Sequence, residues 1–323
     1  MELIWAKRSG DEVAVLPWDI DIECGDSNTF ELAVPVGAWD GSIVPGDLIY
    51  IPWTEYGGIV GEIESSNDPP FVYVKGYTWR GLLSKKIISP PPKQDYYTIA
   101  GNSAECIARL LNDFYKDALF QSDAENSVTI KPYQFNRYTD LLSGINAMLK
   151  TAGNRLSLRY LGDAASVALT TGPIENYGTE INYDGLDAMK ISSRIVYNGV
   201  NHLVCLGKGE LADRQVLHLY TDAEGNITDK QVLTGRDEIT EVYDYSAAED
   251  LEELRRGGIE RLNELKNASY IDASADSLKG AMEIGDVVTA TDPITGASVR
   301  KPIESKVLSI TGGVPAITYR LEG

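Results

Sequence analysis

Apolar and polar positions alternate along the first 75 residues of the chain, in short runs that turn residues separate. These runs predict strands over residues 2–7, 13–23, 29–36, 47–53, 59–64 and 71–75. Glycine, asparagine, aspartate and proline gather between the runs, for example at residues 67–70. Many short strands at this spacing are typical of a small barrel or sandwich.

The apolar period changes after Gly76. Helical spacing then relates four apolar residues, Trp79, Leu82, Leu83 and Ile87. Thr78 directly precedes them as an N-cap, so the pattern predicts a short helix. The helix cannot continue through Pro90-Pro91-Pro92, because proline lacks an N–H and moves the residue before it out of the α region. We therefore expect a first domain to end near residue 90.

Residues 91–187 mix helical and strand periods. The pattern predicts one helix from Asn102 or Ser103 to about residue 120, and a second helix that Thr139 caps and Gly153 ends. Strands are expected over residues 128–135, 156–161 and 167–171. This order of elements predicts a small α+β domain.

Strand periods return from residue 188. We expect strands over residues 190–198, 201–208, 214–220, 239–243, 286–291, 301–310 and 316–321. A charged helix that begins at Ser246 interrupts them at about residues 246–267. Gly257-Gly258 weakens this helix by roughly 2 kcal/mol relative to alanine, which predicts a break or kink. We assign residues 188–323 to a second β-barrel-like domain with this helix inserted.

A faint internal repeat connects the two β regions. Pro45-Gly46-Asp47 and Ile284-Gly285-Asp286 each place a glycine and an acid before an alternating strand, and a further strand follows each. The alignment covers only seven positions, residues 45–51 against residues 284–290, and so leaves open whether the repeat is a duplication or chance. The fold class we predict is α+β, mostly β, with two small β-barrel-like domains, residues 1–90 and 188–323, that flank an α+β domain of residues 91–187.

The length and composition of the chain indicate how many domains it has and where it folds. A chain of 323 residues exceeds one core of typical size, so several domains are expected. The sequence has no apolar run long enough to span a bilayer, and its N-terminus lacks the pattern of a signal peptide. We therefore expect the chain to fold in a cytoplasm.

The net charge is −19, from 48 acids and 29 bases, and the acids are spread along the chain. Nucleic-acid binding needs clustered lysine and arginine, so this composition disfavours it. An acidic wall would instead repel phosphates and keep a duplex from sticking. Asp19, Asp21 and Glu23 alternate with isoleucines and make one face of a strand wholly anionic. That face is either a solvated outer surface or the acidic lining of a channel.

Residues with catalytic or ligating chemistry are scarce. The two histidines, His202 and His218, sit within apolar runs, so a hydrolase triad or a zinc site of several imidazoles has little to work with. The three cysteines, Cys24, Cys106 and Cys205, are far apart and indicate buried free thiols. Residues 222–229 resemble a calcium loop only loosely and are interpreted as a hairpin turn, and residues 207–209 as another turn.

All five tryptophans lie in the first 80 residues: Trp5, Trp18, Trp39, Trp53 and Trp79. A domain of this size more often uses such residues in its core and at a subunit contact. A sugar-stacking platform or an adhesive patch is the other possibility. That possibility supports an alternative function, a carbohydrate-binding or cell-wall-degrading protein.

Three segments of the chain resemble the hub proteins at the tail tips of long-tailed phages and prophages. The first is a strand that ends in Gly-Tyr-Thr-Trp-Arg-Gly-Leu-Leu and runs into Ile-Ile-Ser-Pro-Pro, residues 76–91. The second covers residues 196–211, followed by Arg214 and the strand over residues 216–220, and the third covers residues 284–292.

This resemblance implies a structural protein of the phage virion, assembled in the cytoplasm of the host bacterium. In that family two barrel-like domains of each subunit alternate around a homotrimer, and the ring joins a hexameric tail tube to a threefold tip. The implied partners are tube or distal tail proteins and tip or fibre proteins. DNA would pass through the ring without specific binding, and no membrane insertion is expected. We predict no catalytic, cofactor or metal site and no enzymatic activity.

Overall fold

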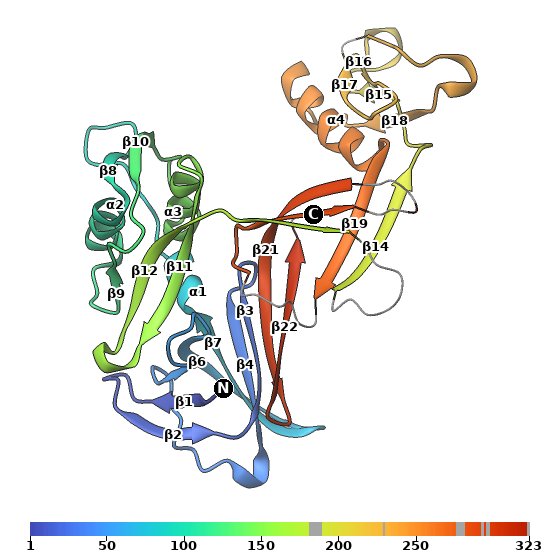
Figure 1. The fold of residues 1–323 in the computed structure, drawn as a ribbon. Coiled ribbons are helices and arrows are strands. Elements are labelled where there is room, and N and C mark those ends of the chain that lie inside the picture. Colours follow the sequence, from blue (N-terminus) through green and yellow to red (C-terminus); the bar gives the residue numbers. More distant parts are fainter. Residues whose placement is uncertain (181–188, 229, 276–281, 292–293, 295–297, 322–323) are drawn as a thin grey trace. The chain divides into compact units, whose positions relative to one another are not determined.

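The computed structural model describes residues 1–180, 189–228, 230–275, 282–291, 294 and 298–321 (Figure 1). The predicted fold class, α+β and mostly β, is confirmed. None of the sheets formed by the described residues closes into a barrel. Contacts divide the chain into two compact units. Unit 1 holds residues 1–190, 273–289 and 300–323, and unit 2 holds residues 191–272 and 290–299.

The largest sheet has eleven strands, in the order β13-β20-β21-β3-β4-β7-β6-β5-β1-β2, with β22 paired to β21. Its strands are β1 (Leu3–Ala6), β2 (Glu12–Leu16), β3 (Asp19–Cys24), β4 (Thr29–Pro35), β5 (Leu48–Tyr50), β6 (Gly57–Asn67), β7 (Pro70–Thr78), β13 (Asn176–Glu180), β20 (Val287–Thr291), β21 (Ser298–Thr311) and β22 (Val314–Leu321). The predicted single strand over residues 13–23 is two strands, because Pro17 between β2 and β3 has no N–H for a ladder.

Strands from both ends of the sequence share this sheet. β21 pairs antiparallel with β3, so that Leu308 lies opposite Ile22. Figure 1 shows the two strands side by side, one red and one blue. The sheet thus joins residues of the first and third predicted domains, 1–90 and 188–323. The three-domain division itself stays a prediction.

Among the residues that the structure describes, three helices and two smaller sheets complete unit 1. They are α1 (Trp79–Ser84), α2 (Ser103–Leu110), a π-helical turn (Leu111–Tyr115), α3 (Leu141–Lys150), the pair β8 (Thr98–Asn102) and β10 (Thr129–Gln134), and the sheet β11-β12-β9 of Asn154–Leu161, Ser166–Pro173 and Phe120–Ser122. Short 3-10 turns occur in the chain at Val36–Ala38, Gly162–Ala164, Leu211–Asp213 and Gly235–Asp237.

The predicted helices of unit 1 exist, with shifted ends. Thr78 caps α1 as expected, and its hydroxyl oxygen accepts from the Gly81 N–H. The helix predicted to reach residue 120 ends at Tyr115, because Lys116 adopts a left-handed φ of 59°. Asp140, and not Thr139, caps α3.

A network of buried charges joins segments of unit 1 that are distant in sequence. Glu55, between β5 and β6, accepts from Arg80 Nε of α1 at 2.6 Å and lies 2.5 Å from Lys306 Nζ of β21. These three side chains are at most 5% exposed. Lys306 also contacts Glu283 at 2.8 Å, and Arg80 donates to the Leu156 carbonyl. The network therefore ties β21 to the N-terminal strands and to α1.

The pKa values in this network show which effect dominates. Burial alone would raise the pKa of Glu55, but Arg80 and Lys306 outweigh it and lower that pKa to about 2. Burial would likewise lower the pKa of Lys306, but Glu55 and Glu283 raise it. All three groups are thus charged at neutral pH, and each depends on its partners.

The two glycine–aspartate turns of the faint repeat share one geometry. Gly46 and Gly285 both adopt a φ of 96°. The Gly46 N–H donates to Val60, whose own N–H donates to the Asp47 carbonyl, and Gly285, Ile303 and Asp286 repeat both bonds. Asp47 and Asp286 are buried, and each carboxylate accepts from the N–H three residues before it. The repeat therefore extends from sequence to backbone hydrogen bonding.

Unit 2 packs one helix on a four-stranded sheet. The sheet order is β17-β16-β15-β18, from Ile227–Thr228, Val216–Thr221, His202–Leu206 and Thr240–Asp244, and the helix is α4 (Leu251–Leu265). Strands β14 (Met189–Val196) and β19 (Ala268–Ala275) pair separately. Leu203, Cys205, Leu219, Leu254 and Leu262 are buried in the core of the unit.

Two expectations for α4 are corrected. Asp250, not Ser246, is its N-cap, with its carboxylate accepting from the Glu253 N–H. The helix also runs unbroken through Gly257-Gly258. A Cβ on Gly258 would lie 2.6 Å from Cys205 Sγ and 2.9 Å from Leu219 Cδ1. The glycine therefore allows the helix to approach the sheet, and this packing offsets its low helix propensity.

Replacing Glu55 by glutamine should lower the free energy of unfolding by about 3–5 kcal/mol, because it leaves Arg80 and Lys306 buried beside each other without the shared carboxylate. Urea denaturation measures the loss. The control is Glu64→Gln, which breaks the half-exposed pair with Lys75 and should cost at most about 1 kcal/mol.

The Glu55→Gln variant also shows how much of the loss of stability at low pH is due to protonation of Glu55. A carboxyl group whose pKa is lowered on folding stabilises the protein above its unfolded pKa, and that contribution is lost as pH falls toward the folded value of about 2. The native chain should therefore lose more stability than Glu55→Gln between about pH 5 and pH 2. Parallel losses in the two proteins would contradict this assignment.

Gly258→Ala should destabilise unit 2 by about 1–3 kcal/mol, although alanine is the better helix former, because its Cβ overpacks against Cys205 and Leu219. Thermal unfolding measures the change. Asn263→Ala is the control on the exposed side of the same helix and should be neutral or slightly stabilising. A stabilised Gly258→Ala protein would show that the close approach does not exist.

Candidate interaction face

Strand β3 carries the anionic pattern that the sequence indicates. Ile20 and Ile22 are buried, whereas Asp19 and Asp21 are exposed and Glu23 is partly exposed. The carboxylates therefore lie on the solvent side of the sheet and the isoleucines on its core side.

Pairing of the strands extends this acidic surface. Asp21 lies opposite Glu31 of β4, and Glu31 lies opposite Lys75 of β7. Lys75 in turn lies opposite Glu62 of β6. We call the resulting surface the acidic face, and its carboxylates are Asp19, Asp21, Glu23, Glu31, Glu62 and Glu64. Sequence reasoning found the first three and missed the others, because only the register of four strands brings them together.

Two cations balance part of this charge. Lys75 bridges Glu64 at 2.6 Å and Glu31 at 3.3 Å, and Arg320 lies 3.2 Å from Glu23. Asp21 has no cationic partner among the described residues, and it faces a second carboxylate, that of Glu31. The acidic face therefore keeps a net negative charge, which repels phosphates.

The histidines lie next to each other on the sheet of unit 2, where His202 is partly buried and His218 is exposed. His202 Nε2 is 2.8 Å from His218 Nδ1, and His202 Nδ1 is 2.6 Å from Glu238 Oε1. Within the described ranges, no three ligating residues are arranged to hold a metal ion.

The described part of the chain also has no helix that is long and apolar enough to cross a membrane.

The cysteines and the loop that loosely resembles a calcium site both have structural roles. Cys24, Cys106 and Cys205 are buried free thiols, as predicted. Residues 222–226 form a turn in which the Asp222 carboxylate accepts from the Asn226 N–H, in agreement with the predicted hairpin. Asp229 lies outside the described residues.

The tryptophans do not gather on one surface. Trp5 and Trp79 are buried, and Trp79 stacks on Tyr160 with ring centroids 5.2 Å apart. Trp18 and Trp39 pack partly buried against the core of the large sheet. Trp53 is 62% exposed. Most of the set thus serves packing, which is the interpretation that the sequence favours.

No family model and no curated protein matches the sequence. In structure the chain is similar to a tail protein from Neisseria meningitidis MC58, with 11% identity, a TM-score of 0.48, and coverage of 100% of this chain and 97% of that one. It is also similar to the 43 kDa tail protein of prophage MuSo2 from Shewanella oneidensis, with 13% identity, a TM-score of 0.51, and coverage of 100% of this chain and 98% of that one. The prophage tail protein gp18 from Listeria monocytogenes EGD-e has 13% identity and a TM-score of 0.49, and the match covers 99% of this chain and 94% of that one.

Asp21→Asn should raise the free energy of unfolding by about 0.2–1 kcal/mol at low salt, because it removes a like charge directly opposite Glu31. The gain should shrink in 1 M salt, where the Debye length is about 3 Å. Urea denaturation at two salt concentrations measures both effects. Glu23→Gln, which loses the Arg320 contact, is the control and should give no gain. A destabilised Asp21→Asn protein would contradict the assigned repulsion.

Proposed function

We propose that the chain is a structural, non-enzymatic component of a phage or prophage tail, because its fold is similar to that of a prophage tail protein over its whole length. We further propose that it forms a homotrimeric, ring-shaped hub at the tail tip or baseplate, where it joins the tail tube to the tip and lets DNA pass. The observation that carries the proposal is the full-length likeness to the tail protein from Shewanella oneidensis.

The acidic face is suited to the inner wall of the proposed ring. Its strands β3, β4, β7 and β6 present carboxylates to solvent, with Lys75 as the cation among them. A channel through which DNA moves needs walls that do not hold phosphates, and a net negative surface meets that need. We therefore propose that the acidic face lines the channel.

The repeated turns are consistent with a threefold ring. A trimer that joins a hexameric tube must present six similar positions, two from each subunit. The turns around Asp47 and Asp286 give each subunit two strand starts with the same hydrogen bonds. In this proposal the neighbours are tube or distal tail proteins on one side and tip or fibre proteins on the other, within a virion that assembles in the host cytoplasm.

Light scattering over a range of concentrations and salt tests the ring. The expected mass is three times the subunit mass of 35.3 kDa. A monomer at every concentration would contradict self-assembly into a ring. Binding of the monomer to host cell-wall glycans, lost on Trp53→Ala, would then favour the alternative of a carbohydrate-binding tail-associated protein.

Charge reversal tests the channel. In assembled particles, the combined variant Asp19→Lys and Asp21→Lys should slow DNA ejection, because cations in the wall would bind phosphates. The matched control is Glu224→Lys, an exposed acid of unit 2, which should eject DNA at the native rate. Native ejection by the double variant would show that the acidic face does not line the channel.

A further inference from the structure

Strand β9 forms an open edge of the sheet β11-β12-β9. It pairs in parallel with β12, with Phe120 opposite Val167 and Ser122 opposite Leu169. The Val167 N–H donates to the Leu119 carbonyl and the Asp123 N–H to the Leu169 carbonyl. In a parallel ladder this register turns the N–H and C=O groups of Phe120 and Ser122 away from β12. Among the described strands, none pairs with that side of β9.

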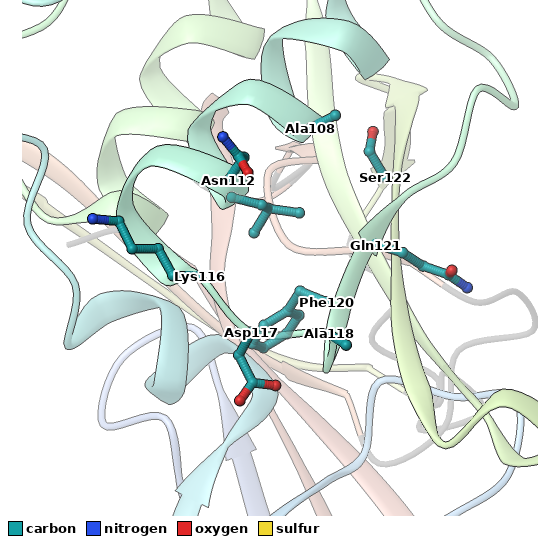
Figure 2. Close-up of a pocket in the computed structure, with 9 residues that line it drawn as sticks. Ala108, Asn112, Lys116, Asp117, Ala118, Phe120, Gln121 and Ser122 are labelled. Atoms are coloured by element: carbon teal, nitrogen blue, oxygen red, sulfur yellow. The ribbon is translucent and has the colours of Figure 1, made fainter.

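A groove of about 680 Å³ runs along this open edge. Figure 2 shows Ala108, Asn112 and Lys116 from the helical segment on one side of it. Ala118, Phe120, Gln121 and Ser122 line the other side. The volume is within the range of roughly 300–1,000 Å³ that binding pockets occupy. The edge of β9 is therefore open to a ligand.

The π-helical turn shapes one wall of the groove. The Lys116 N–H donates to the Leu111 carbonyl five residues earlier, at 2.9 Å, and this wider turn ends the helix beside β9. Such turns occur often at functional sites. The Lys116 side chain is exposed and makes no ion pair with the described residues. Asp117 beside it already accepts from the Leu119 N–H.

We propose that an extended peptide segment of another protein binds this groove and adds a fourth strand to the sheet. The outward groups of Phe120 and Ser122 are two residues apart, or about 6.6 Å, which is the repeat that an extended chain presents. Main-chain hydrogen bonds of this kind give affinity to strand addition, and side-chain contacts give specificity. We expect small or apolar side chains against Ala108 and Ala118, and a carboxylate near Lys116.

This site does not depend on the proposed tail function, and it uses none of the residues of the acidic face. An exposed edge with a groove beside it binds a partner that supplies an extended segment, and the exposed Lys116 in the lining favours a segment that carries an acidic residue.

Selection of a displayed library of linear seven-residue peptides against the full chain tests the proposal. Ser122→Pro removes the outward N–H and places a ring in the groove, while the ladder to β12 keeps its bonds. Its control is Ser122→Ala, since both variants lose the 2.7 Å hydrogen bond to the Ala104 carbonyl. Ala108→Arg fills the groove from the helix side, and Ala147→Arg on α3 is the matched exposed control.

The selected peptides should bind the native chain and lose at least about tenfold in affinity with Ser122→Pro and with Ala108→Arg. Both control variants should stay close to native affinity. Hydrogen exchange at the Phe120 and Ser122 amides should slow when peptide is bound. If Ser122→Pro does not fold, Ala108→Arg decides. Failure to select any peptide, or binding that the groove variants leave unchanged, would overturn the proposal.

Discussion

The shared carboxylate of Glu55 is the contact on which the architecture of unit 1 depends. It holds Arg80 of α1 and Lys306 of β21, two cations 226 residues apart in sequence, in one dry cluster. A buried ion of either sign would be costly alone, so each of the three groups requires the other two. Apolar burial is not directional, whereas the cluster requires Lys306 of β21 to lie at Glu55. The cluster thus specifies how the C-terminal strands attach to the N-terminal ones.

This attachment has a consequence for the surface. Once β21 pairs with β3, the edge of the N-terminal strands is covered, and the carboxylates of β3 and β4 remain on one solvent side. Arg320, which reaches Glu23, comes from the adjoining hairpin of β21 and β22. The sheet that carries the acidic face therefore also contributes Lys306 of β21 to the buried charge cluster.

Local chemistry made much of the fold predictable from sequence. Thr78 capped α1 where the period changed, and the alternation at Asp19 and Asp21 placed the acids on the exposed side of β3. What could not be predicted depends on distant partners. Gly258 breaks no helix because Cys205 lies against it, and Glu31 joins Asp21 only through strand register. Sequence periods carry no information on either contact.

Electron cryomicroscopy of the assembled tail particle is the decisive experiment for the proposed ring. We expect a threefold ring of this chain at the tip of the tail, with Asp19, Asp21 and Glu31 facing the central channel. A particle in which these carboxylates point outward would contradict the proposed channel. Absence of the chain from the tail would contradict the structural role itself.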